Sequence, residues 1–130
     1  MFRSVKMFSF LAALILLTSL GCGPSPEDAR QQLKQAGLTV SSDALIKSIH
    51  AGDNRAVHLL LSAGLAPNKP DGQGKLPLME ATIKNRGAIV INLLARGADP
   101  NAKPDKYGLT ALDYAKQLDH QSLIHVLGKM

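Results

Sequence analysis

The sequence is poor in residues that disulfide-stabilised, nucleic-acid-binding and membrane-spanning proteins need. It has one cysteine, Cys22, so no disulfide can form within the chain. It has no tryptophan, two tyrosines, three phenylalanines and no basic run. Because nucleic acids are bound by stacking aromatics and clustered Lys or Arg, we expect no nucleic-acid partner. The apolar run at residues 7–17 is short for a membrane-crossing helix, which needs about 20 apolar residues.

That apolar run lies in a segment with the three parts of an export signal. Arg3 and Lys6 precede it, and small residues ending in Gly21 and Cys22 follow it. We therefore expect residues 1–21 to be a signal peptide. Without them the chain has 13 basic and 10 acidic residues, a weak net charge of +3 that would suit an acidic patch on a partner.

The four residues SLGC, which end at Cys22, resemble the lipobox of bacterial lipoproteins, with Ser19 and Leu20 in the reverse of the usual order. The resemblance implies that the Cys22 sulfur carries a diacylglyceryl group and that the mature chain begins there. Several acyl chains on one residue anchor a protein stably, so the membrane is an expected partner through this lipid. The alternative is an ordinary cleaved signal followed by an incidental cysteine.

The residues after Cys22 bear on the expected location. Gly23 stands where an Asp would favour retention in the inner membrane of Gram-negative bacteria, so the resemblance implies an outer-membrane lipoprotein that faces the periplasm. The lipidated cysteine and a tether stiffened by two prolines would occupy residues 22–26.

One nine-residue phrase occurs twice in the rest of the chain. Residues 60–68 are LLSAGLAPN, and residues 93–101, 33 positions later, are LLARGADPN. The same spacing aligns Leu45 with Leu78, and a spacing of 34 aligns Leu78 with Leu112. Each unit contains two short apolar patterns of helical period with a polar turn between them, which predicts a helical hairpin. One hairpin cannot bury its apolar faces alone, so at least three must stack, and three are present.

The phrases at residues 76–81, 97–101 and 108–112 resemble the ankyrin repeat, whose pattern runs G-x-T-P-L-H-x-A and later L-L-x-x-G-A-D-x-N. The resemblance covers about residues 43–127 and implies an all-α solenoid of helical hairpins. The expected units are residues 41–73, 74–107 and 108–130, which together form the ankyrin-repeat domain at residues 41–130. An N-terminal capping helix is expected at residues 27–40.

Several residues should shape this solenoid. Asp53 or Asn54 can cap the second helix of the first unit, and Gly64 and Gly97 can take the left-handed conformation that closes a helix. The side chains that could cover the first unit from the capping helix are Ala29, Leu33 and Ala36.

Two units depart from the family pattern. Leu76 and Met79 replace its Thr and His in the second unit, and the third has Thr110 with Asp113. We therefore expect apolar packing, more than polar contacts, to hold the units together.

The sequence gives no pattern that predicts an enzyme, a cofactor site or a metal site. His50 and His58 fall on different expected helices, and His120 and His125 are five residues apart, so neither pair has the i, i+4 spacing of a helical metal site. There is no Gly-x-Ser-x-Gly motif and no phosphate-binding glycine loop.

The expected function is binding to another protein. Ankyrin domains bind proteins with the tips of the turns between units and with the groove side of the first helices. Carried over by position, the candidate partner-binding residues are Lys69, Asp71, Gln73 and Lys75 in the first turn, Lys103, Asp105, Lys106 and Tyr107 in the second, and His50 and Lys84, with Arg86 beside it, on the helices. Each lysine has the alternative of being a solvated turn residue. Tyr107 is preferred because exposed aromatics often anchor interfaces.

Together these patterns predict a monomeric, lipid-anchored periplasmic protein that binds and holds or protects another envelope protein. The alternative is an immunity-type inhibitor of a toxin enzyme that reaches the periplasm. The sequence does not identify the partner.

Overall fold

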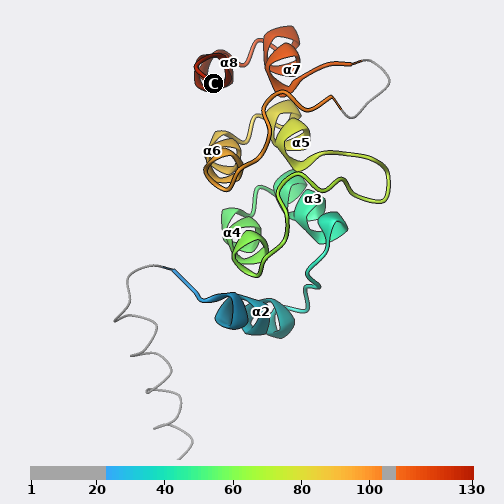
Figure 1. Cartoon of the computed structure of the whole chain (residues 1–130), viewed down its shortest axis with the longest axis vertical. Coiled ribbons are helices and arrows are strands. Elements are labelled where there is room, and N and C mark those ends of the chain that lie inside the picture. Colours follow the sequence, from blue (N-terminus) through green and yellow to red (C-terminus); the bar gives the residue numbers. More distant parts are fainter. Residues whose placement is uncertain (1–22, 104–107) are drawn as a thin grey trace, which may run out of the picture.

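The computed structural model describes residues 23–103 and 108–130, in which seven helices and no strand are found (Figure 1). The expected signal segment and four residues of the second long loop lie outside these ranges. The helices are α2 (Pro26–Gln35), α3 (Ser42–Ala51), α4 (Asn54–Ser62), α5 (Pro77–Ile83), α6 (Gly87–Ala95), α7 (Ala111–Gln117) and α8 (Gln121–Gly128). The all-α stack of helical hairpins expected from the 33-residue period is confirmed.

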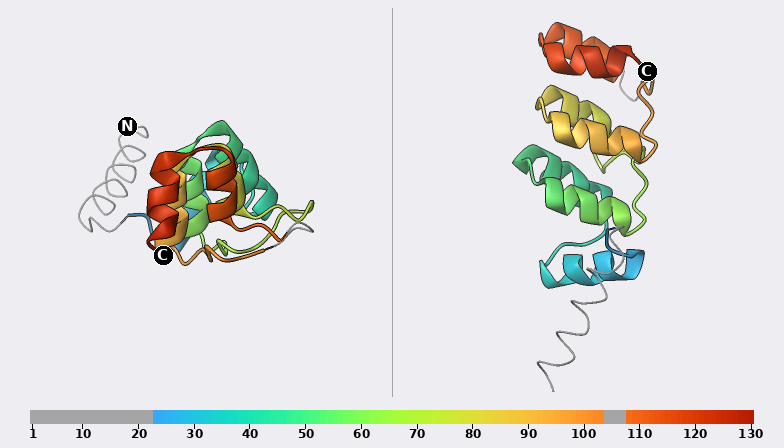
Figure 2. Two further views of the ribbon diagram at one scale, coloured as in Figure 1. Left: turned by 90° about the horizontal axis from the view of Figure 1, so that it is seen from above. Right: turned by 90° about the vertical axis from the view of Figure 1, so that its left-hand side faces the viewer.

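The hairpins stack in two layers along the long axis of the molecule (Figures 1 and 2). We call α3, α5 and α7 the inner helices and α4, α6 and α8 the outer helices. Each inner helix contacts the next, α4 contacts α6, and α2 packs against α4 at one end. The two long loops that join the units are residues 63–76 and 96–110, and their described parts project on the side of the inner helices (Figure 1). No helix in the described ranges has the length and apolar character needed to cross a membrane.

Repeated positions make the core. Leu60 and Leu93, which are 33 residues apart, are both fully buried, and so are Val57 and Val90. Burial of one such side chain contributes about 1.5–3 kcal/mol relative to its exposure. The phrase therefore recurs in the sequence because the same positions are buried in successive hairpins.

The helix ends follow the expected rules. Asp53 is the N-cap of α4 and accepts a hydrogen bond of 2.9 Å from the Ala56 N–H. Gly64 and Gly97 follow the C-caps of α4 and α6 with φ of +99° and +90°, a region that favours glycine. Both predicted roles are confirmed.

The capping helix α2 is shorter than expected. Its N-cap Ser25 accepts from the Asp28 N–H, and Ala29 and Leu33 are fully buried as predicted. The prediction for Ala36 is wrong, because the helix ends at Gln35 and leaves Ala36 exposed at the C-cap. α2 therefore covers α4 with two apolar side chains.

At two positions, the far end of the array has exposed polar or small residues where the first unit buries apolar side chains. Ile49 in the first unit and Thr82 in the second are fully buried, whereas Lys116, the equivalent residue in the third, is exposed. Leu61 is likewise buried, and its equivalent Gly128 is exposed. Such substitutions are typical of a terminal repeat that nothing covers.

Polar contacts also tie one unit to the next. The Arg86 guanidinium donates to the His50 carbonyl at 3.0 Å. One unit later, His120 Nε2 lies 3.4 Å from the Ile83 carbonyl. One repeat position is occupied by Asp53, Arg86 and His120 in the three successive units. In the second and third units, the side chain at this position contacts a backbone carbonyl of the preceding unit.

The polar contacts at the start of the inner helices differ between the second and third units. Leu76, the N-cap of α5, makes no side-chain capping bond. Thr110 and Asp113 instead form a complete capping box at α7. The Thr110 backbone N–H, aided by its hydroxyl, holds the pKa of the Asp113 carboxyl below its ordinary value of 3.8.

Candidate protein-binding surface

The first long loop is shaped by Asp71. Its Oδ1 atom accepts from the Gln73 N–H at 2.9 Å and from the Lys75 N–H at 2.8 Å. The Gly72 N–H donates to Asp43 on α3 at 3.0 Å, which fixes the loop to the inner layer. Hydrogen bonds to the Asp71 side chain and to Asp43 on α3 therefore hold the loop tip in place. The role of Asp71 is structural.

Three other candidate binding residues lie on this first loop. Lys69 and Gln73 are exposed, and Lys75 is half-buried. Because the backbone between them is constrained by hydrogen bonds, a partner that binds here meets a preorganised surface.

The second long loop is tied to the first. The Asn68 side chain donates to the Gly97 carbonyl at 3.0 Å and accepts from the Asp99 N–H at 2.7 Å. Lys103 is exposed further along the loop. The other candidates of this loop, Asp105, Lys106 and Tyr107, lie outside the described residues.

The inner helices place the remaining candidates beside the loops. His50 Nε2 lies 2.5 Å from Glu80 Oε2, so this pair connects α3 to α5. The side chains are 36% and 14% exposed, which leaves His50 accessible from the inner side. Lys84, the C-cap of α5, is exposed. The Arg86 guanidinium donates its hydrogen bond to the His50 carbonyl.

Two further basic residues of the inner helices were missed by the sequence reasoning. Lys47 on α3 and Lys116 on α7 are exposed. Lys47 takes the repeat position of Glu80. Aligning the first unit with the second by the 33-residue period would have identified Lys47 from the sequence.

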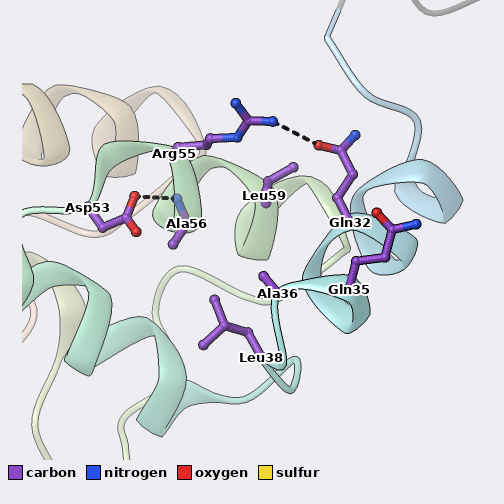
Figure 3. A pocket seen from close by; sticks show the side chains of 8 residues that line it. All are labelled: Gln32, Gln35, Ala36, Leu38, Asp53, Arg55, Ala56 and Leu59. Carbon is purple, nitrogen blue, oxygen red and sulfur yellow. Dashed lines mark hydrogen bonds between the residues drawn. The ribbon is translucent and has the colours of Figure 1, made fainter. Parts of the chain in front are cut away.

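A hollow between α2 and α4 was also not predicted (Figure 3). It has a volume of about 330 Å³, and Arg55 and Gln32 approach each other across its rim at 3.5 Å. The residues that line it are Gln32, Gln35, Ala36, Leu38, Asp53, Arg55, Ala56 and Leu59. It arises because α2 packs on α4 without an inner-helix partner of its own. No pattern in the sequence signals it.

The described side chains do not form a metal centre. Within residues 23–103 and 108–130, no group of three or more His, Cys, Asp or Glu side chains could hold a metal ion. The exposed loops and inner helices therefore offer hydrogen-bonding and ionic groups for recognition, and the described residues show no arrangement for a metal-assisted reaction.

Comparison with known proteins agrees with this architecture. The family model for ankyrin repeats (three copies) matches residues 11–104 and 45–129. An ankyrin repeat-containing protein of Treponema pallidum is 32% identical over 85 residues, which are 65% of this chain and 28% of that protein. An IkB-like protein of African swine fever virus is 37% identical over 60 residues, 46% of this chain and 25% of that protein.

An L-asparaginase of Dirofilaria immitis is 37% identical over 79 residues, 61% of this chain and 13% of that enzyme. The chain thus spans between 13% and 28% of the lengths of these three relatives. Because so little of the enzyme is matched, this likeness assigns no activity to the chain.

Proposed function

The chain belongs to the ankyrin-repeat family, whose domains are protein-binding modules, and from this premise we propose that it is a membrane-tethered periplasmic adaptor or protector of another envelope protein. Two hydrogen-bonded loops project from the inner layer, and this preorganised surface carries the proposal. Lysines on both loops and on all three inner helices or their caps are available to a partner.

The membrane tether is supported by the sequence. An export signal ends at the chain's single cysteine, and three acyl chains on Cys22 would replace a membrane span. Gly23 favours the outer membrane over the inner one, since the inner-membrane retention signal is an Asp at that place.

The tether is tested by labelling cells of a Gram-negative host with a fatty-acid analogue. The parent chain should incorporate the label and fractionate with the membrane, and Cys22→Ala should lose both properties. Equal labelling of the two proteins, or a parent found only in the soluble fraction, would refute the anchor.

The binding surface is tested by recovering partners from envelopes of cells that carry the affinity-tagged chain. Tyr107→Ala should weaken the recovered complex about tenfold or more, because truncated interface aromatics often cost 2 kcal/mol or beyond. The exposed Gln121→Ala on outer helix α8 is the matched control and should bind like the parent. If Tyr107→Ala binds with unchanged affinity, the second loop does not carry the binding. The groove around His50, Ile83 and Lys84 is then the next candidate binding surface.

The identity of the recovered protein separates the two roles. A resident envelope protein whose abundance falls when this chain is deleted supports the adaptor. A toxin enzyme whose activity falls on binding would instead establish the immunity-type inhibitor.

A further inference from the structure

The two layers of the solenoid differ in charge. Each inner helix carries one carboxylate, namely Asp43, Glu80 or Asp113, whereas the outer helices α4, α6 and α8 carry no Asp or Glu. Carboxylates lie beside the outer layer at positions flanking its helices, such as the N-cap Asp53, and in the first turn of α2, which carries Glu27 and Asp28 and packs on α4. The outer helices themselves therefore place no carboxylate against an anionic surface, although lysines are more numerous on the inner helices and the loops.

The exposed side of the outer helices combines basic and apolar side chains. We define the outer face by six residues at equivalent or adjacent repeat positions: Arg55, His58, Ile91, Ala95, His125 and Lys129. Ile91 is 56% exposed, which is high for an isoleucine, and helix α6 has no charged residue at all. Basic groups around an exposed aliphatic side chain are the composition of interfacial membrane-binding surfaces.

The start of the described chain lies against this same face. A Cβ atom built on Gly23 would lie 3.6 Å from His58 Nε2 on α4. Residues 23–25 leave α2 on the side of the outer helices, and the described parts of the two long loops project on the opposite side (Figures 1 and 2). Cys22 is joined directly to Gly23, with consecutive Cα atoms about 3.8 Å apart. An acyl group on Cys22 would thus begin beside the outer face.

We propose that the outer face rests on an anionic phospholipid surface and that the inner helices and loops consequently point away from the membrane. This inference rests on the proposed lipidation of Cys22. With the anchor supplying stable attachment, the face needs only to orient the domain, and each Lys or Arg near an anionic surface shifts such an equilibrium about fivefold. Orientation by this face would present the loops to a partner.

The absence of tryptophan from the chain makes the orientation measurable. Ile91→Trp places a single fluorophore in the outer face, and Lys84→Trp places a matched one on the inner layer at another exposed position. Both lipidated proteins are reconstituted into vesicles of phosphatidylethanolamine and phosphatidylglycerol whose acyl chains are brominated near the headgroup. Circular dichroism confirms that both variants are folded.

The fluorescence of Ile91→Trp should shift to the blue and be quenched about threefold more strongly than that of Lys84→Trp, because interfacial side chains insert about 5–10 Å. Equal quenching of the two, or stronger quenching of Lys84→Trp, overturns the proposal. So does an unquenched Ile91→Trp that becomes shielded only when envelope proteins are added, since the face would then bind protein.

Two matched double variants test how much the basic side chains contribute to membrane binding. In the Ile91→Trp background, Arg55→Gln with Lys129→Gln should reduce quenching on anionic vesicles, and Lys47→Gln with Lys116→Gln on the inner helices should not. Equal effects of the two pairs would contradict a specific outer face.

The anchor can fail separately from the orientation. If mass spectrometry shows no lipid on Cys22, its thiol can be coupled to a maleimide phospholipid, which supplies the anchor chemically. The quenching comparison then still decides the orientation. Failure of lipidation refutes the proposed tether, and failure of quenching on an anchored protein refutes this inference alone.

Discussion

Leu60 and Leu93 occupy the same place in successive units, and both side chains are fully buried. Truncation to Ala removes apolar contacts and leaves a cavity between units, so Leu60→Ala or Leu93→Ala should each lower the free energy of unfolding by about 2–5 kcal/mol. Urea titration followed by circular dichroism measures the change. Ile91→Ala is the control, because the same aliphatic truncation at a 56% exposed position should cost far less.

Asp113 is a residue whose contribution should depend on pH. Hydrogen bonds from Thr110 lower its pKa in the folded state, so it binds a proton more readily when unfolded. Its ionised form therefore stabilises the fold above the ordinary carboxyl pKa of 3.8, and this contribution is lost as the pH falls through the lowered value.

Asp113→Asn should accordingly melt at a lower temperature than the parent at neutral pH. The difference should shrink as the pH falls from about 4 towards 2, because the parent carboxyl then becomes neutral as well. Melting curves at several pH values measure it. A difference that stays constant down to the lowest pH would mean that the carboxylate charge contributes nothing.

At the scale of the elements, the hairpin α3/α4 is joined to the next by Arg86, which lies over Gly52. Gly52 ends α3 with φ of +72°, and a Cβ there would lie 2.9 Å from the Arg86 guanidinium. Gly52→Ala should therefore displace Arg86 from the His50 carbonyl as well as strain the backbone, at a combined cost of about 2–3 kcal/mol.

Gly74→Ala provides the comparison for that prediction. Gly74 also has a positive φ, +79°, but nothing lies within 4 Å of a Cβ built on it. It should show the backbone strain alone, about 1–2 kcal/mol. If Gly52→Ala costs no more than Gly74→Ala in the same denaturation experiment, Arg86 contributes nothing to the junction.

The period in the sequence predicted the elements better than the contacts between them. Spacings of 33 and 34 residues between Leu45, Leu78 and Leu112 placed the inner helices, because apolar positions must recur wherever similar hairpins stack. The ties made by Arg86 and His120 could not be predicted, since a side chain that crosses from one unit to the next depends on their relative placement. The exposed Ala36 was mispredicted for a similar reason, because the helix ends one residue before it.

For the candidate binding residues, the sequence likewise predicted exposure on the loops better than contacts between helices. Lys69, Gln73 and Lys103 are exposed on the loops, as turn chemistry indicated, whereas the pairing of His50 with Glu80 required the packing of α3 on α5. Lys47 went unnoticed because it belongs to no motif. Repeat register identifies the position of such a residue, and only the fold shows that it faces outward.

At the scale of the whole molecule, the solenoid is expected to be monomeric because its last unit has a polar and a small residue at two positions where the first unit packs on its neighbour. Lys116 and Gly128 occupy the places where the first unit buries Ile49 and Leu61 against its neighbour. An uncovered apolar end would be a surface onto which another copy could stack. Lys116 and Gly128 therefore oppose growth of the array by association.

Restoring the apolar residues should remove this protection. The variant that combines Lys116→Ile with Gly128→Leu gives the third unit the side chains that the first unit buries, and it leaves the Thr110–Asp113 capping box intact. We expect the mature parent chain without lipid to sediment as a monomer and the double variant to form dimers as its concentration rises. A control that combines Lys47→Ile with Lys84→Leu adds similar apolar area on exposed inner positions that lie away from the end of the array. Sedimentation velocity distinguishes the cases: if the control associates as strongly as the double variant, general hydrophobicity drives association, and the end of the array has no special role.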